Sequence, residues 1–223
     1  MIIFHGSEKI IRQPSFIKGN HSNDYGKGFY CTEDIELAKE WACKKKTNGF
    51  VNQYSIDLNG LSVCNLNGGN YHILHWLALL TKHRSYWQQK SIAEQAKNYL
   101  QEHFLIDISA FDVITGYRAD DSYYSFAQDF IMGTISLQKL AVAMKLGNLG
   151  EQIVLKSEKA FERIQYECCE IALVEEYYVK KSQRDLEARR AYQETRGSLD
   201  FSNDIYMIDI LRGRVSEDEL FLQ

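Results

Sequence analysis

Short apolar runs separated by polar turns dominate the chain, and the spacing of the apolar positions follows two patterns. Alternation with polar residues, or a short apolar run bounded by turn residues, predicts a strand. Recurrence every three and four residues predicts a helix. The strand pattern covers 2–4, 29–32, 50–58, 61–66, 111–116, 153–156 and 165–173. The helix pattern covers 32–42, about 71–104, the region around 126–130, 135 to near 147, a short stretch after 157, and 182–197.

This mixture of strands and helices predicts an α+β fold. The chain has 223 residues, 45% of them hydrophobic, which suffices for one sizeable domain and a small appendage. We expect a main domain over 1–175, with a helical insertion at about 71–104. A helical C-terminal extension over 176–223 would pack on it. Its basic residues are interleaved with acidic ones, so a solvated helix face is the plain reading there. The tail from 204 to 223 is a candidate for docking a partner.

Charge and composition narrow the classes of function. The 26 basic and 30 acidic side chains give a net charge of −4, which is not the pattern of nonspecific nucleic-acid binding, although a nucleic-acid acceptor stays open. No apolar run of about 18 residues and no signal segment is present, so we expect a cytoplasmic protein without a membrane partner. The five cysteines include the neighbours Cys168 and Cys169 and form no Cys-x-x-Cys pair, which favours reduced thiols.

Three histidines come close together in the sequence and raise the question of a metal site. His72, His75 and His83 lie in the predicted helical insertion. Their spacing, with no Glu or Cys to complete a ligand set, does not match a known zinc pattern. We therefore expect them to be core or surface histidines, and we expect no metal.

Two stretches near the N-terminus carry the candidate chemistry. The apolar strand 2–4 ends in His5-Gly6-Ser7, and a glycine bend, Gly26-Lys27-Gly28, leads into the aromatic pair Phe29-Tyr30. A dinucleotide-binding fold would need a longer glycine fingerprint between a strand and a helix, so that reading is rejected. Taken alone, the second stretch is typical of a hairpin turn followed by a core tyrosine.

Together, the two stretches resemble the NAD-binding signature of the poly(ADP-ribose) polymerases and the wider diphtheria-toxin-like ADP-ribosyltransferases. Those enzymes carry a second aromatic residue 11 positions after the tyrosine, and here Trp41 follows Tyr30 by 41 − 30 = 11. A tryptophan on an apolar helical face is usually a core residue, but a buried indole can also form the floor of a pocket. The resemblance implies catalytic roles for His5 and Tyr30, and NAD-binding roles for Gly6, Ser7, Gly28 and Trp41.

The same enzymes place a Glu or Gln at the start of a later strand, and here Glu151 and Gln152 stand side by side. Strand alternation sends them to opposite faces, so only one can lie in the site. We prefer Gln152, because the segment 152–160 is similar to that of a bacterial family of ADP-ribosyltransferase-like toxins. The segments 117–123 and 209–213 share this similarity. One departure is Ala38, which stands where the polymerases have a serine that bonds the carboxamide of NAD.

Arg118 lies at a junction between a predicted strand and a predicted helix. One reading of the charge there is that Asp120 or Asp121 caps the helix. Arg118 itself carries a planar guanidinium that fits a phosphate in two-point contact. In an NAD site it would hold the pyrophosphate.

The resemblance therefore implies an ADP-ribosyltransferase-like split sheet with NAD as co-substrate. We expect transfer of ADP-ribose to a macromolecular acceptor, protein or nucleic acid, as mono-ADP-ribosylation, since a Gln in place of Glu disfavours polymer formation. Members of the similar toxin family are typically encoded beside a small partner protein, which implies a toxin–antitoxin pair. Two alternatives remain. One is an NAD glycohydrolase, and the other is a catalytically silent module that binds NAD or a protein.

Overall fold

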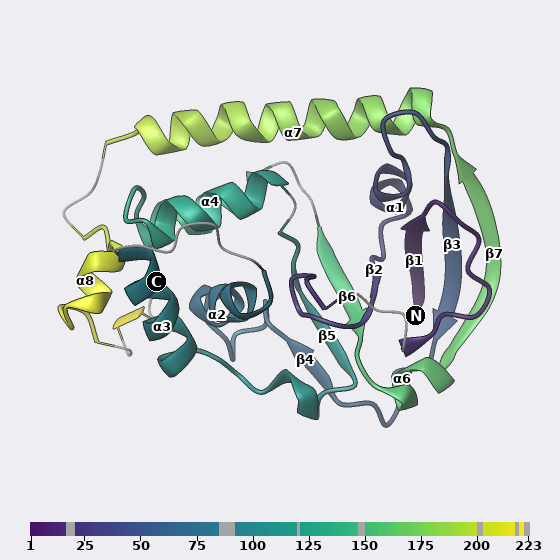
Figure 1. Ribbon diagram of the computed structural model, residues 1–223, viewed down its shortest axis with the longest axis horizontal. Coiled ribbons are helices and arrows are strands. Elements are labelled where there is room, and N and C mark those ends of the chain that lie inside the picture. Colours follow the sequence, from purple (N-terminus) through teal and green to yellow (C-terminus); the bar gives the residue numbers. More distant parts are fainter. Residues whose placement is uncertain are drawn as a thin grey trace.

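Two small β-sheets form the centre of the protein, and each combines strands from distant parts of the chain (Figure 1). The first sheet has the order β1-β3-β7 and is antiparallel. The second has the order β2-β6-β5-β4, in which β4 and β5 pair in parallel and the other neighbours are antiparallel. The strands are β1 (Ile2–Ser7), β2 (Phe29–Cys31), β3 (Gly49–Ile56), β4 (Val63–Asn65), β5 (Val113–Tyr117), β6 (Glu151–Leu155) and β7 (Ile164–Ala172).

This structure is a computed structural model, and it describes residues 1–16, 21–84, 92–119, 121–146, 150–199, 203–216 and 219–220. Among these residues, no helix is long and apolar enough to cross a membrane. The helices are α1 (Ile35–Ala42), α2 (Ile73–His83), α3 (Ile92–His103), η2 (Ile108–Ala110), α4 (Asp121–Ile131), α5 (Leu137–Ala143), α6 (Glu158–Glu162), α7 (Val174–Gly197) and α8 (Met207–Leu211).

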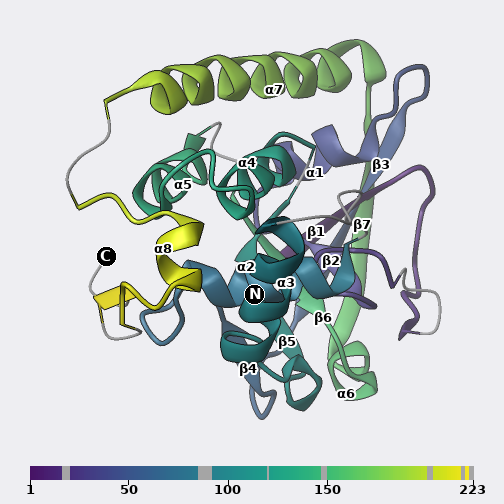
Figure 2. The ribbon, with the colours of Figure 1, turned by 60° about the vertical axis from the view of Figure 1, so that its left-hand side comes forward.

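The longest helix, α7, lies along one side of the molecule and passes over α1 at one end and α4 at the other (Figures 1 and 2). The second sheet packs against α2 and α4, where Trp76, Phe126 and Phe130 are almost fully buried. A smaller core between the two sheets contains Ile3 and Leu155. Burying such large side chains is the main stabilising contribution, at about 1.5–3 kcal/mol for each.

The two sheets meet where β1 comes beside β2. Phe4 and Thr32 exchange two backbone hydrogen bonds, with N···O distances of 2.7 and 3.0 Å. In an antiparallel pair, the N–H and C=O groups of alternate residues point to the same edge of a strand. Gly6 therefore directs its backbone N–H and C=O to the same edge of β1 as Phe4. It lies two residues further along β1 than the pair with Thr32. This is the edge at which the candidate site lies.

The predicted α+β class is confirmed, and two helix starts differ from the prediction. Helix α1 begins at Ile35 rather than at 32, and Asp34 caps it, because its carboxylate accepts from two backbone N–H groups. Helix α7 begins at Val174, so that Ser182 lies inside the helix and donates to the carbonyl of Tyr178 instead of capping it. The prediction missed this start because β7 leads almost directly into the helix.

Candidate functional site

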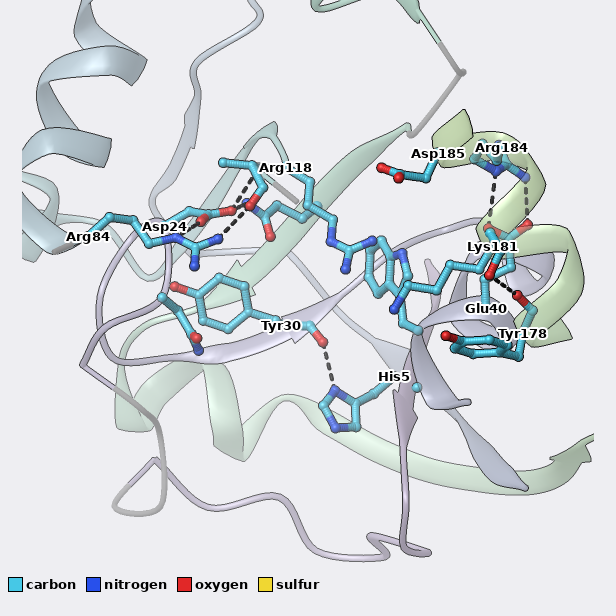
Figure 3. Close-up of a pocket in the computed structure, with 16 residues that line it drawn as sticks. His5, Asp24, Tyr30, Glu40, Arg84, Arg118, Tyr178, Lys181, Arg184 and Asp185 are labelled. Carbon is cyan, nitrogen blue, oxygen red and sulfur yellow. Dashed lines mark hydrogen bonds and ion pairs between the residues drawn. The ribbon is translucent and has the colours of Figure 1, made fainter. Parts of the chain in front are cut away.

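A cavity of about 580 Å³ lies beside the junction of the two sheets (Figure 3). This volume is within the range of about 300–1,000 Å³ that small-molecule sites have. Its wall includes side chains or backbone from β1, β2, α1, the end of β5, and β6. The cavity brings together six of the residues singled out from the sequence: His5, Gly6, Tyr30, Trp41, Arg118 and Gln152.

His5 is held by the strand opposite it. Its Nδ1 lies 2.7 Å from the carbonyl oxygen of Tyr30, and its ring stacks on Phe29 with 4.3 Å between centroids. A carbonyl oxygen only accepts, so Nδ1 carries the hydrogen and the neutral ring keeps Nε2 as an acceptor. Burial lowers the pKa of His5 below 6.5, while the bond to Tyr30 opposes this shift. The ring is therefore neutral at neutral pH.

The ring of Tyr30 is fixed by the loop that precedes it. Its hydroxyl donates to the carbonyl of Gly26 at 2.6 Å and accepts from the backbone N–H of Tyr25 at 3.1 Å. Gly26 has a φ of 70°, a left-handed conformation that glycine adopts without strain. Burial also raises the pKa of Tyr30 well above 10, so the phenol stays protonated. These hydrogen bonds thus fix the position of the Tyr30 ring relative to the glycine bend.

Gly6 allows α1 to pack directly on β1. A Cβ at this position would lie 2.1 Å from the carbonyl oxygen of Ala38, which no side chain can tolerate. Ser7 and Gly28 do not line the cavity. The hydroxyl of Ser7 donates to the carbonyl of Lys9, and a Cβ on Gly28 would meet Val154 at 2.5 Å. In the structure, Ser7 makes local hydrogen bonds and Gly28 allows close packing on β6.

Arg118 covers one face of Trp41. Its Cζ lies 4.3 Å from the centre of the indole, within the distance of a cation–π contact. The indole Nε1 is buried, and no acceptor for it exists among the described residues. The other reading of this junction was a helix cap at Asp120 or Asp121. Asp120 and the side chain of Asp121 lie outside the described residues. Trp41 and Arg118 thus form a single stacked wall of the cavity.

Gln152 and Glu151 lie on opposite faces of β6. Gln152 is 3% exposed and lines the cavity, whereas Glu151 is exposed and its carboxylate accepts from Asn67 at 2.8 Å. The amide of Gln152 donates from Nε2 to Asp24 at 2.9 Å and to the carbonyl oxygen of Tyr117 at 3.0 Å. Both amide hydrogens are used, and no described residue donates to Oε1. An acceptor oxygen is therefore left for a ligand.

The sequence analysis missed Asp24 and Arg84, which also line the cavity. Asp24 is 5% exposed and its carboxylate accepts from the backbone of Ala119, from Gln152, and from Arg84 at 2.8 Å. Arg84 also donates to the carbonyl of Ala119. The only sequence signal was the position of Asp24 beside the glycine bend, because its partners lie 60 residues or more away in the chain.

Helix α7 forms the remaining wall of the cavity, which the sequence analysis also missed. Glu40 is 3% exposed on α1 and pairs with Arg184 through two contacts, at 2.7 and 3.1 Å. Such a two-point pair is among the strongest side-chain contacts. The other α7 residues at the wall are Tyr178, Lys181, Ser182 and Asp185. A charged residue on α1, next to Trp41, was the signal that could have revealed this contact.

Two of the three histidines of the helical insertion serve local structure. His72 caps α2 by accepting from Leu74, and the ring of His75 accepts in turn from the backbone of His72. Within the described part of the chain, no three His, Cys, Asp or Glu side chains gather as metal ligands.

Comparison with known families gives a match over most of the chain. Residues 1–166 match the model of the family described as "Protein of unknown function (DUF3990)". The protein is a member of the DUF3990 family. The matched segment runs from β1 into β7, and it contains all six sequence-predicted residues that line the cavity. Helices α7 and α8 lie outside it. Neither a curated protein nor a solved structure matches the chain significantly.

Proposed function

We propose that this DUF3990 protein is an NAD-dependent ADP-ribosyltransferase with a split-sheet ADP-ribosyltransferase fold. One observation carries the proposal. Six residues that the sequence resemblance assigns to an NAD site come from positions between 5 and 152 and line a single cavity. A resemblance that arose by chance would not be expected to collect them at one place.

The nicotinamide end of NAD fits the part of the cavity between β1 and β2. Tyr30 offers an aromatic face there, and a cationic ring stacked on it gains about 1–2 kcal/mol when water is excluded. Gly6 offers its backbone N–H and C=O, which suit the carboxamide. Trp41 forms the adjoining wall, and because one of its faces carries Arg118, its first task is to hold that arginine.

Two uncharged acceptors suit the ribose. Nε2 of His5 and Oε1 of Gln152 both belong to groups whose other polar atoms are already bonded. Each can accept from a ribose hydroxyl without first losing a protein contact. A hydrogen bond to the hydroxyl beside the reacting carbon strengthens as positive charge develops on the sugar. Groups held in place in this way stabilise the transition state more than the ground state.

The reaction breaks the bond between nicotinamide and the ribose. The bonding pair leaves with neutral nicotinamide, the ribose carbon becomes oxocarbenium-like, and a nucleophilic oxygen or nitrogen of the acceptor bonds to it and releases a proton. Arg118 is placed to hold the pyrophosphate during this step, since a guanidinium binds phosphate oxygens in two-point contact. With Gln152 in place of a carboxylate, we propose transfer of a single ADP-ribose to a protein or nucleic acid.

The biological role that fits this activity is that of a bacterial toxin held in check by a small antitoxin protein. This part of the proposal rests on the similarity of 152–160, 117–123 and 209–213 to the toxin family. The antitoxin proposal is tested by coexpressing this chain with a small protein encoded beside it. We expect loss of toxicity and formation of a complex. Persistent toxicity with no complex would contradict the proposed antitoxin.

The decisive experiment combines nicotinamide release with adduct detection. The protein is incubated with labelled NAD and cell lysate, and the labelled fraction is treated with protease or nuclease. Transfer gives nicotinamide together with a labelled macromolecule, and the sensitive treatment identifies its class. Release without any adduct would make the protein an NAD glycohydrolase. No release with any acceptor would leave a silent module and overturn the proposed activity.

A further inference from the structure

Helix α7 is joined to α1 next to the cavity by side-chain contacts. Arg184 grips Glu40 of α1 through two contacts, and Tyr177 donates to Glu36 of the same helix at 3.3 Å. A buried Glu–Arg pair of this geometry resists rotation of one helix against the other. The α7 side chains that line the cavity therefore belong to the same wall as α1.

Most charged groups at the cavity are already paired. Arg84 is paired with Asp24, Arg184 with Glu40, and Asp185 with Arg189 of the next helical turn. Lys181 is different. It is half-buried and lines the cavity, yet it has no hydrogen-bond or ion-pair partner among the described residues.

Its neighbour Lys180 shows the contrast on the same helix. Lys180 is exposed and contacts Glu36 at 3.2 Å and Glu176 at 2.7 Å. A half-buried ammonium without a partner has given up part of its hydration without gaining an ion pair, which is unfavourable unless an anion arrives. The position of Lys181 therefore suits an anionic ligand.

Lys181 and Arg118 approach the cavity from opposite walls. In Figure 3, the Arg118 side chain extends from the end of β5 and the Lys181 side chain from α7, and both reach toward the middle of the cavity. A ligand group between them would meet one planar guanidinium and one ammonium. Two cations across a gap suit a group with two negative charges, such as a diphosphate.

We propose that α7 is a substrate-binding element and that Lys181 holds the diphosphate of NAD from the side opposite Arg118. This inference rests on the proposed function and extends it to a helix outside the family-matched segment 1–166. The matched segment would supply the nicotinamide and ribose contacts. A residue beyond that segment would then supply part of the affinity for the ADP half.

The test compares Lys181→Ala with the matched control Lys180→Ala. The probes are ADP-ribose and nicotinamide, titrated by calorimetry, with nicotinamide release from NAD measured in parallel. Losing one charge-assisted contact should weaken ADP-ribose binding about 10- to 100-fold in Lys181→Ala. Nicotinamide affinity should stay unchanged, and Lys180→Ala should bind both probes as the wild type does. Lys181→Arg should recover most of the ADP-ribose affinity, because it restores the cation.

Each other outcome has a definite meaning. If the wild type releases nicotinamide and Lys181→Ala binds ADP-ribose as tightly as Lys180→Ala, the inference is wrong while the proposed function stands. If Lys181→Ala raises only the KM for the acceptor, Lys181 binds the acceptor and the inference is also wrong. If the wild type neither binds ADP-ribose nor releases nicotinamide, the proposed function is wrong, and the inference that rests on it is wrong as well. Equal unfolding temperatures of the two alanine variants exclude misfolding as the cause of a difference.

Discussion

Gln152 donates one amide hydrogen to Oδ2 of Asp24 at 2.9 Å and the other to the carbonyl oxygen of Tyr117 at 3.0 Å. A half-turn of the amide would bring Oε1 against both acceptor oxygens, which is repulsive. Asp24 thus fixes which end of the Gln152 side chain is left as an acceptor. The neutral side chain of Gln152, which we propose takes part in catalysis, is in this way oriented by the buried carboxylate of Asp24.

Asp24→Asn should destabilise the fold. The substitution removes the anion from Arg84, whose side chain is 32% exposed, and places an amide hydrogen or a neutral oxygen where three donors converge. Losing hydrogen bonds to a charged group costs about 1.5–3 kcal/mol of the free energy of unfolding, measured by urea denaturation. Asp57→Asn is the control, because the Asp57–Arg163 pair is exposed on both sides and is worth about 0–1 kcal/mol. Equal losses for the two variants would contradict a special role for Asp24.

The strands could be read from the sequence because apolar alternation is a local signal, whereas most of the cavity residues were singled out by a resemblance of two short stretches to a known motif. Apolar alternation placed β1, β3 and β6 to within a few residues, and the neighbours Glu151 and Gln152 had to face apart. The pairs Asp24–Arg84 and Glu40–Arg184 could not be read in this way, because each joins residues 60 or 144 positions apart.

Helix α7 illustrates the same limit. Its charges alternate in sign, which is also what a solvated helix looks like. Contact with α1 decides which of them are buried. The acidic pair Glu175 and Glu176 in its first turn was the local signal for its true start, since acidic side chains favour helix N-termini. Ser7 and Gly28 belong to the two motif stretches, yet neither lines the cavity.

The activity should fall in acid because of His5. Burial lowers its pKa below 6.5, so nicotinamide release should stay level to a lower pH than an ordinary histidine would allow. Below the lowered pKa, Nε2 is protonated and can no longer accept from the ribose. The rate should then drop by about tenfold per pH unit, as for any single essential base. The measurement is the pH profile of kcat/KM for nicotinamide release.

The same shift affects stability in a defined window. The unfolded chain binds a proton at His5 as the pH falls through 6.5, whereas the folded chain binds it only lower, so stability from the neutral ring is present above 6.5 and lost below it. His72, with a pKa lowered to about 4, contributes in the same direction but lies outside the cavity. His72→Asn keeps a capping side chain on α2 and should leave the rate profile unchanged. If the pH profile of kcat/KM shifts in this variant, the loss of activity in acid is caused by unfolding and not by His5.

Arg118→Lys should weaken binding of ADP-ribose while sparing nicotinamide. Lysine keeps the charge but loses both the planar stack on Trp41, at 4.3 Å, and the two-point contact with phosphate. We expect a loss of roughly 1.5–3 kcal/mol in ADP-ribose binding, measured by calorimetry. Arg163→Lys, on the far surface pair with Asp57, should change neither ligand. Equal weakening of ADP-ribose and nicotinamide would return Arg118 to a purely structural role.

Gln152→Ala is the sharpest test of the chemistry, because the substitution removes the oriented acceptor and leaves Asp24 two of its three donors, Arg84 and Ala119. Tyr117 keeps two other donors to its carbonyl oxygen, from Tyr25 at 2.7 Å and Trp76 at 3.1 Å, so the fold should tolerate the change. Removing one preorganised transition-state contact lowers kcat by about 10²- to 10³-fold, and ADP-ribose affinity should barely change.

Glu151→Ala is the matched control for this variant, since Glu151 is the adjacent residue on the opposite, exposed face of β6 and bonds only Asn67 among the described residues. Its rate of nicotinamide release should stay within about twofold of the wild type, because surface substitutions of this kind have small effects. The two variants are compared by single-turnover release of nicotinamide beside titration of ADP-ribose. A reversed ranking would mean that β6 presents its other face to the ligand, since a shift of one residue exchanges the two faces of a strand. If release is unchanged in both variants, neither residue of β6 takes part in the chemistry. His5 on β1 and Tyr30 on β2 would then remain as the catalytic candidates.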